Sequence, residues 1–278
     1  MSASKKPCSK DPFREDRESN GVHRMECEGE TLPLLLRLKD VRRTAKDWKT
    51  FSSDNPPMIM PHSEADVRTV RQLPLEIDPP DHGEYRALVE PLFRRAKDPE
   101  YAEGMRTLID GMVAGLPDRG TLDAVREFAL PLQSRALARL LKVDESEADL
   151  WISWGIHVFR DSKAGAGEGP ALERYTTKKF EEAARNPGED FFSLLNGIEF
   201  RGRKLTMEEK NGFANVTFAG GRDTVIHTVS GIIAHFAAHP GGLRQLREDP
   251  TLCRTATEEF VRHVSPLTVL TRKCPHGA

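Results

Sequence analysis

The feature that most constrains this chain is a long apolar helical pattern that begins at Thr206 and runs to His239-Pro240. Thr206 and Glu209 fit a capping box, in which the threonine caps backbone amides and the glutamate reaches back to the cap residue. Apolar residues then recur with helical spacing for about eight or nine turns of 3.6 residues each. A continuous helix over 206–238 is long enough to cross a domain, so the sequence predicts a fold organised around it.

The middle of this pattern reads F-A-G-G-R-D-T-V, with two adjacent glycines inside a helix. Each interior glycine costs on the order of 0.5–1 kcal/mol relative to alanine, so Gly220 and Gly221 need a reason. One reason is close packing of another helix. Another is Thr224, whose hydroxyl can bond the Gly220 carbonyl, bend the helix and open a groove. Asp223 beside that hydroxyl is either part of a proton relay or a solvated helix position.

The remaining periodicity predicts a mainly α fold with a small β component. Further helices are expected at 38–51, 82–94, 98–116, 122–143, 145–161, 170–186, 189–196, 241–248 and 252–264. A strand or buried turn is expected at 32–38, a long loop at 54–75 and a hairpin at 198–205. Residues 1–30 are polar and are predicted to be loosely ordered, while residues 31–278 are predicted to belong to a single domain.

Composition excludes several function classes. The 278 residues carry 41 Lys+Arg against 43 Asp+Glu, so no excess charge indicates a nucleic-acid or membrane partner. No apolar stretch has the length of a signal peptide or a membrane span, and a cytoplasmic location is expected. The four cysteines lie far apart, without the spacing of a disulfide scaffold or a zinc site.

A second motif, D-P-P-D-H-G-E-Y-R, leads into the helix expected at 82–94. Its prolines hold the approach extended, Asp81 suits the cap position, and Glu84 would complete a second capping box. His82 and Arg86 are then four residues apart and face the same way. Two cationic side chains near a helix N-terminus can hold a carboxylate or a phosphate, although an ordinary exposed pair has the same spacing.

A third motif, E-F-V-R, places Glu259 and Arg262 three residues apart, where they can form an ion pair within one helix. Such a pair is common by chance when it stands alone. What distinguishes this chain is the order of the three motifs: the proline-led His-x-x-x-Arg helix, the long A-G-G-R-D-T helix, and then Glu-x-x-Arg followed by Ser-Pro.

These three motifs in this order resemble the cytochrome P-450 family of the soluble bacterial kind, over the span from Leu32 to Arg272. The resemblance implies a helical bundle around a long central I helix. It further implies the following roles: His82, Arg86 and Arg272 bind the haem propionates, Gly220 and Gly221 line the oxygen pocket, Asp223 and Thr224 deliver protons to it, and Glu259 with Arg262 forms a structural ion pair.

The family's cysteine ligand lies in an F-x-x-G-x-x-x-C-x-G loop, which does not follow T-R-K-C-P-H-G-A in this chain. Cys274 is only twelve positions beyond Arg262 and lacks the glycines of that loop. Cys253 is no better placed, so no metal ligand is assigned. The expectation is an incomplete cytochrome P-450 fold that is inactive as a haem-thiolate enzyme on its own.

By resemblance, the function is that of a haem-dependent monooxygenase, which inserts one oxygen atom of O₂ into a small or medium hydrophobic substrate. The Asp-Thr pair favours dioxygen with an external electron donor, a ferredoxin or ferredoxin reductase. Two alternatives stay open. One is a truncated, catalytically inactive helical protein that binds a hydrophobic ligand without haem, and the other is a phosphate-binding helical enzyme that contains His82 and Arg86 by chance.

Overall fold

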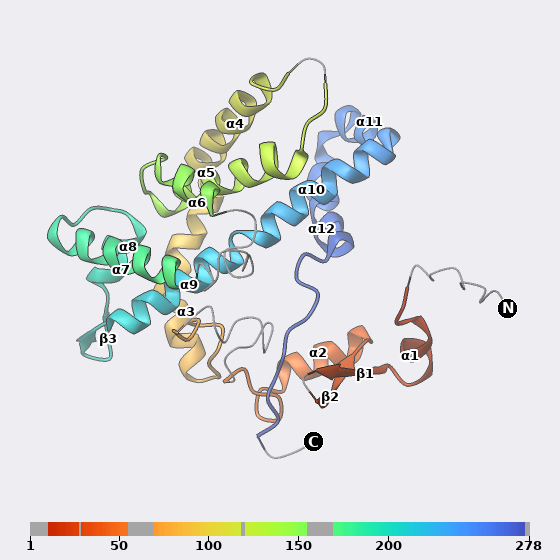
Figure 1. The fold of residues 1–278 in the computed structure, drawn as a ribbon, viewed down its shortest axis with the longest axis horizontal. Helices are drawn as coiled ribbons and strands as arrows, with labels where there is room; N and C mark the ends of the chain where they lie inside the picture. Colours follow the sequence, from red (N-terminus) through yellow and green to blue (C-terminus); the bar gives the residue numbers. More distant parts are fainter. Residues whose placement is uncertain (1–10, 28, 55–68, 118–119, 155–168, 276–278) are drawn as a thin grey trace. The chain divides into compact units, whose positions relative to one another are not determined.

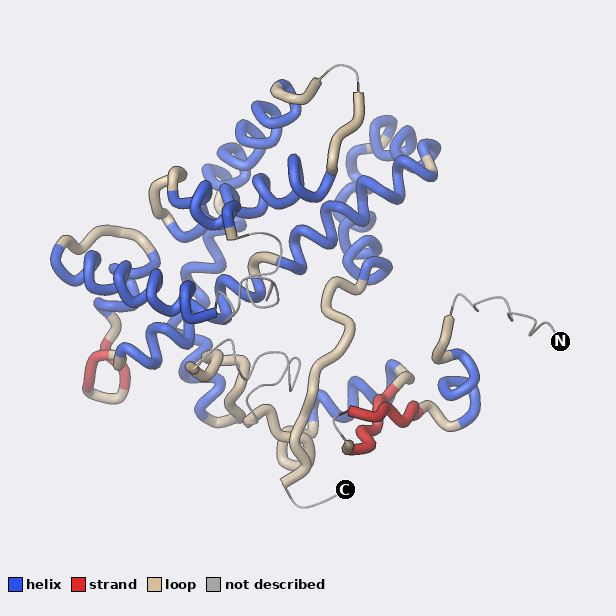
Figure 2. The backbone as a smooth tube through the Cα atoms, in the orientation of Figure 1, coloured by secondary structure: helices blue, strands red, loops and turns tan. Residues whose placement is uncertain are grey.

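The computed structural model describes residues 11–27, 29–54, 69–117, 120–154 and 169–275. The chain divides into two compact units, residues 1–53 with 272–278 and residues 54–271. Figure 2 shows that helices make up most of the described chain and that the strands are short. The predicted mainly α fold with a small β component is confirmed.

The first unit is built on an antiparallel hairpin of β1 (Val22–Cys27) and β2 (Glu30–Leu35), in which Val22 pairs with Leu35. It also contains the helices α1 (Arg14–Ser19) and α2 (Leu38–Lys46). The prediction of a loosely ordered N-terminus is therefore wrong for residues 14–27. The strand was not predicted because its side chains are mostly polar. β1 is stabilised by backbone pairing with β2 rather than by an apolar face.

Two contacts between distant residues hold this unit together. The guanidinium of Arg37 donates to the carbonyl oxygens of Arg17, Glu18 and Ser19 at 2.9–3.2 Å, at the C-terminal end of α1. Those carbonyls have no partner within the helix, so the arginine satisfies them. Ser52 and Lys273 form an antiparallel bridge with N···O distances of 2.8 and 3.0 Å.

The second unit carries the three sequence motifs. Its elements are α3 (Asp81–Arg94), η1 (Arg95–Lys97), α4 (Pro99–Ala114), the π-helix η2 (Ala124–Ala129), α5 (Leu130–Leu141), α6 (Glu147–Ser153), α7 (Gly169–Arg185), α8 (Phe191–Gly197), β3 (Glu199–Phe200), β4 (Arg203–Lys204), α9 (Met207–Gly220), α10 (Asp223–Ala238), α11 (Pro240–Glu248), η4 (Pro250–Leu252) and α12 (Cys253–Val264). Figure 1 shows α9 and α10 following one another through this unit.

The main core of this unit lies where α3 and α5 to α8 surround α9. Aromatic side chains dominate it: the Trp151 ring meets Phe218 edge-on at 4.9 Å, and Phe180 meets Phe192 at 5.0 Å. Edge-to-face contacts of this kind add to the stabilisation from burial. A smaller cluster of Ala129, Leu130 and Ile226 joins η2 and α5 to α10.

Most predicted helices are present with bounds shifted by one to three residues, and the predicted hairpin at 198–205 is formed by β3 and β4. The exceptions are the helix predicted at 38–51, which ends at Lys46, and the long helix, which is two helices rather than one. Of the loop predicted at 54–75, residues 55–68 lie outside the described part of the chain, as do residues 155–161 of the helix predicted at 145–161. Among the described helices, none has both the length and the apolar character needed to span a bilayer.

Candidate functional site

The long helix is interrupted at the glycine pair. α9 ends at Gly220, α10 begins at Asp223, and Arg222 between them has the non-helical angles φ −108° and ψ −82°. The Arg222 side chain is only 2% exposed and donates to the carbonyl oxygen of Trp151 at 2.6 Å. Because the backbone at Arg222 leaves the helical region between α9 and α10, the prediction of one continuous helix over 206–238 is wrong.

Gly221 has a packing role. A side chain there would lie 3.4 Å from Leu137 of α5 and 2.7 Å from the Thr217 carbonyl oxygen. The Gly221 carbonyl, which the interruption frees from the helix, accepts a hydrogen bond from Gln133 Nε2 at 2.7 Å. Close packing of a neighbouring helix, one of the two explanations for the glycine pair, therefore applies to Gly221.

Gly220 has a different role. A Cβ at Gly220 would meet no described atom within 4 Å, and the Thr224 hydroxyl donates to the Gly220 carbonyl at 2.7 Å. The expected bond from Thr224 to Gly220 is thus formed, and open space lies beside Gly220. Asp223 and Thr224 are both half-buried in the first turn of α10. The structure places an acid and an alcohol side by side where the helix is interrupted.

The start of α3 differs from the sequence prediction. Its cap residue is Pro80, which makes no side-chain capping bond, so neither the Asp81 cap nor the second capping box is formed. Asp81 and Glu84 instead bind the guanidinium of Arg201, at 2.5 and 3.0 Å. The charged guanidinium of Arg201, in the β3–β4 hairpin, is a stronger hydrogen-bond donor than a neutral backbone amide, so both carboxylates bind it.

His82 and Arg86 lie one turn apart on α3, as predicted. His82 is half-buried and Arg86 is exposed. Within the described part of the chain, no hydrogen bond or ion pair engages either side chain. Both remain available to an anion, whereas the neighbouring carboxylates of Asp81 and Glu84 are already engaged by Arg201.

Tyr85, between these two residues, ties α3 to the long helix. Its hydroxyl donates to Glu209 at 2.7 Å, and its ring packs against Phe200 at 4.6 Å and Phe213 at 6.1 Å. Glu209 also accepts two bonds from Arg203, at 2.7 and 2.8 Å, and it completes the predicted capping box with Thr206. The sequence signalled Glu209 only as a cap, and its partners Tyr85 and Arg203 were not foreseen.

The Glu209 carboxyl makes stability depend on pH. Hydrogen bonds from Arg203 lower its pKa from 4.5 to about 2, and its side chain is only 12% exposed. Because the folded pKa is lowered, the stabilisation is present above pH 4.5 and is lost as the pH falls towards about 2. The free energy of unfolding of the wild type should fall by roughly 2–3 kcal/mol more than that of Glu209→Gln over this window, measured by urea titration. Glu199→Gln, at an exposed side chain, should behave like the wild type, and parallel curves for all three proteins would contradict the assignment.

Glu259 and Arg262 form the predicted ion pair, with two bonds of 2.6 Å. The bonds from Arg262 lower the pKa of Glu259, yet both side chains are largely exposed, at 59% and 70%. Their helix packs on α10, where Val264 would lie 2.5 Å from a side chain at Gly231. The pair is formed, but its structural role stays a prediction, because both side chains are largely exposed.

Arg272 is half-buried and belongs to the first unit, whereas His82 and Arg86 belong to the second. Its propionate role therefore stays a prediction from the sequence. Cys253 is exposed and Cys274 is half-buried, and both are free thiols. No group of three or more metal-ligating side chains occurs among the described residues.

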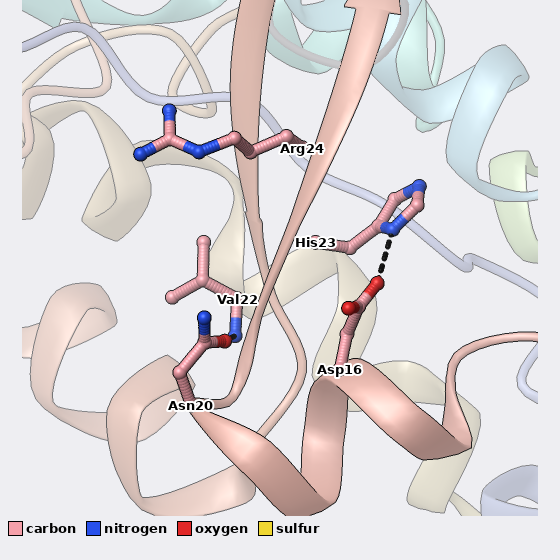
Figure 3. Close-up of a pocket in the computed structure, with 5 residues that line it drawn as sticks. All are labelled: Asp16, Asn20, Val22, His23 and Arg24. Atoms are coloured by element: carbon pink, nitrogen blue, oxygen red, sulfur yellow. Dashed lines mark hydrogen bonds and ion pairs between the residues drawn. The ribbon is translucent and has the colours of Figure 1, made fainter.

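A surface pocket in the first unit is a weaker candidate (Figure 3). His23 Nδ1 lies 2.6 Å from Asp16 Oδ2, which resembles part of a catalytic dyad. However, His23 and Arg24 are consecutive in a strand and point to opposite sides of it, as Figure 3 shows. Because the polar groups do not converge, this pocket offers no site for a reacting atom.

The comparisons with known proteins agree with the geometry of the second unit. No protein-family model matches the chain. A solved structure of a carbohydrate active P450 is 43% identical, covers 96% of this chain and 72% of its own, and superimposes with a TM-score of 0.89. The chain belongs to the cytochrome P450 family.

Curated P450s are more distant in sequence. The vitamin D(3) 25-hydroxylase of Pseudonocardia autotrophica is 29% identical over 84% of this chain and 59% of its own length. The P450 monooxygenase PikC of Streptomyces venezuelae is 30% identical over 84% of this chain and 55% of its own length. The chain thus spans less than two thirds of the curated P450s that it matches.

The residues present fit the haem group that the family binds. A histidine and an arginine without described partners, His82 and Arg86, suit the paired carboxylates of a porphyrin. The open space beside Gly220 suits a small ligand next to the Asp223–Thr224 pair. Both features are contributed by α3 and by the interrupted long helix. Gln133 and Arg222, which stabilise the interruption, were not identified from the sequence. The one sequence signal for Arg222 is the glycine pair beside it.

Proposed function

We propose that the full-length protein is a haem-dependent monooxygenase that inserts one oxygen atom of O₂ into its substrate. The observation that carries this proposal is the interruption of the long helix, which sets the Thr224 hydroxyl 2.7 Å from the Gly220 carbonyl with Asp223 beside it. An acid and an alcohol held next to open space can pass protons to a small ligand. P450 relatives support the same chemistry.

Haem would supply the oxidation chemistry, which a thiolate ligand to its iron favours. The protein's own residues would bind and orient it. In the proposed arrangement, His82 and Arg86 bind its carboxylates, with Arg272 as a further candidate, while Tyr85 holds α3 against α9 through Glu209. Asp223 takes protons from solvent and Thr224 passes them on. A ferredoxin-type protein is the proposed electron donor.

A reduced, carbon-monoxide-treated absorption spectrum tests this function. The haem-loaded full-length protein should show a Soret band in the position of a thiolate-ligated complex. The 278-residue chain, in which no cysteine has the ligand-loop motif, should not. Absence of bound haem from the complete protein would instead support the haem-free binding protein. A thiolate band from the 278-residue chain would make Cys253 and Cys274 candidate iron ligands.

For the substrate, we propose a carbohydrate in place of the hydrophobic molecule expected from the sequence. The 43% identity to a carbohydrate active P450 supports this class.

Spectral titration of the haem-loaded protein distinguishes the two substrate classes without requiring turnover. Oligosaccharides should shift the Soret band by an amount that saturates as their concentration rises, and apolar compounds such as terpenes should not. The reverse result would restore the hydrophobic substrate.

A further inference from the structure

The chain that enters α3 lies directly on α9. A Cβ at Gly212 would stand 2.4 Å from the backbone oxygen of Arg71 and 3.3 Å from Leu73 Cγ. The Leu73 amide donates to the Gly212 carbonyl at 3.3 Å. Because the nearest obstacle is backbone, no rotation of a side chain could relieve the overlap. Gly212 is therefore required for residues 71–73 to lie where they do.

Buried polar groups fix this segment in one register. Gln72 Nε2 donates to Asn215 Oδ1 at 2.7 Å, and both side chains are 1% exposed. The backbone N–H of Gln72 donates to Glu76 Oε2 at 2.8 Å, and Glu76 is fully buried. Sliding the segment along α9 would break the Gln72–Asn215 bond without access to water, which is costly.

The segment and α3 are attached to the same side of α9. Glu209, which binds Tyr85, is followed at three-residue intervals by Gly212 and Asn215. Residues spaced in this way are neighbours on a helix surface. His82 and Arg86 lie three residues before and one residue after Tyr85, on the helix that the Tyr85–Glu209 bond ties to α9.

We propose that Gly212, together with the Gln72–Asn215 amide pair, is a positioning element for His82 and Arg86. It sets their distance from the Gly220–Thr224 turn and thereby gives them a selective hold on the paired carboxylates of haem. This inference rests on the proposed function and adds to it residues that touch neither the cofactor nor the substrate.

The test compares the affinity for haem with the affinity for haem dimethyl ester, whose carboxylates are masked. In the full-length protein, the wild type should prefer haem about tenfold, as charged hydrogen bonds to carboxylates predict. Gly212→Ala should reduce this ratio to about one, because His82 and Arg86 are displaced. A substitution that only destabilises the protein weakens both affinities equally and leaves the ratio unchanged. Gly197→Ala, where a Cβ meets nothing within 4 Å, should retain the wild-type ratio.

Each outcome is decisive. A wild type without any preference, matched by the His82→Leu/Arg86→Leu double variant, overturns the proposed role of these two residues and the inference with it. A wild type that prefers haem, together with an equal preference in Gly212→Ala, overturns the inference and leaves the proposed function intact. If Gly212→Ala does not fold, the Gln72→Leu/Asn215→Leu variant replaces it, because it removes the amide pair without adding bulk at the glycine. A reduced ratio in that variant supports the inference, and an unchanged ratio overturns it.

Discussion

In the full-length protein, Asp223→Asn is expected to lower kcat roughly 100-fold while KM changes little. Asp223 is half-buried at the start of α10 and adjoins Thr224, whose hydroxyl is held 2.7 Å from the Gly220 carbonyl. A carboxylate can take up and release a proton, whereas the isosteric amide cannot. Steady-state kinetics over a range of pH, with product yield per electron consumed, measure the effect.

The chain provides a matched control for the adjacent hydroxyl. Thr228 Oγ1 donates to the Thr224 carbonyl at 2.7 Å, the same bond that Thr224 makes one turn earlier. Thr224→Val should lower the product yield per electron, whereas Thr228→Val should not. Equal losses at both threonines, or an unchanged kcat in Asp223→Asn, would contradict the relay and leave Asp223 as a solvated helix residue.

Arg222→Met is expected to lower the free energy of unfolding by roughly 2–4 kcal/mol. Arg222 is the most deeply buried arginine among the described residues, and its guanidinium donates to the Trp151 carbonyl at 2.6 Å. Methionine fills much of the space of the arginine stem but donates no hydrogen bond, so that carbonyl loses its charged donor inside the protein. Chemical denaturation of the two proteins at neutral pH measures the difference.

Arg174→Met provides the comparison, because Arg174 is exposed on α7. It should change the free energy of unfolding by no more than about 0.5 kcal/mol. If Arg222→Met is as mild as this control, the interruption of the long helix is not held by the arginine. The glycine pair and Gln133 would then have to account for it.

The helices could be predicted from sequence because the information for them is local. Thr206 and Glu209 cap their helix as their spacing indicated, and β3 and β4 form the predicted hairpin. The Glu259–Arg262 pair likewise involves residues one turn apart. The family, and with it the candidate residues on α3 and α10, followed from the order of three such local motifs.

Long-range partners explain what the sequence did not predict. Asp81 and Glu84 have the types and spacing of a capping box, yet they bind Arg201 more than a hundred positions later in the chain. The N-terminal residues 22–27 form a strand only because β2 pairs with them. In each case the competing partner cannot be recognised from nearby residues.

The candidate site shows the same division. The sequence by itself determined that an acid–alcohol pair follows two glycines in a long helix and that His82 and Arg86 share one face of another. Only the tertiary structure decided that the long helix is interrupted there. The bonds from Arg222 to Trp151 and from Gln133 to Gly221 span 71 and 88 positions, and they satisfy the buried polar groups that the interruption creates. A helix pattern extends over a few turns, whereas these partners are brought together only by folding.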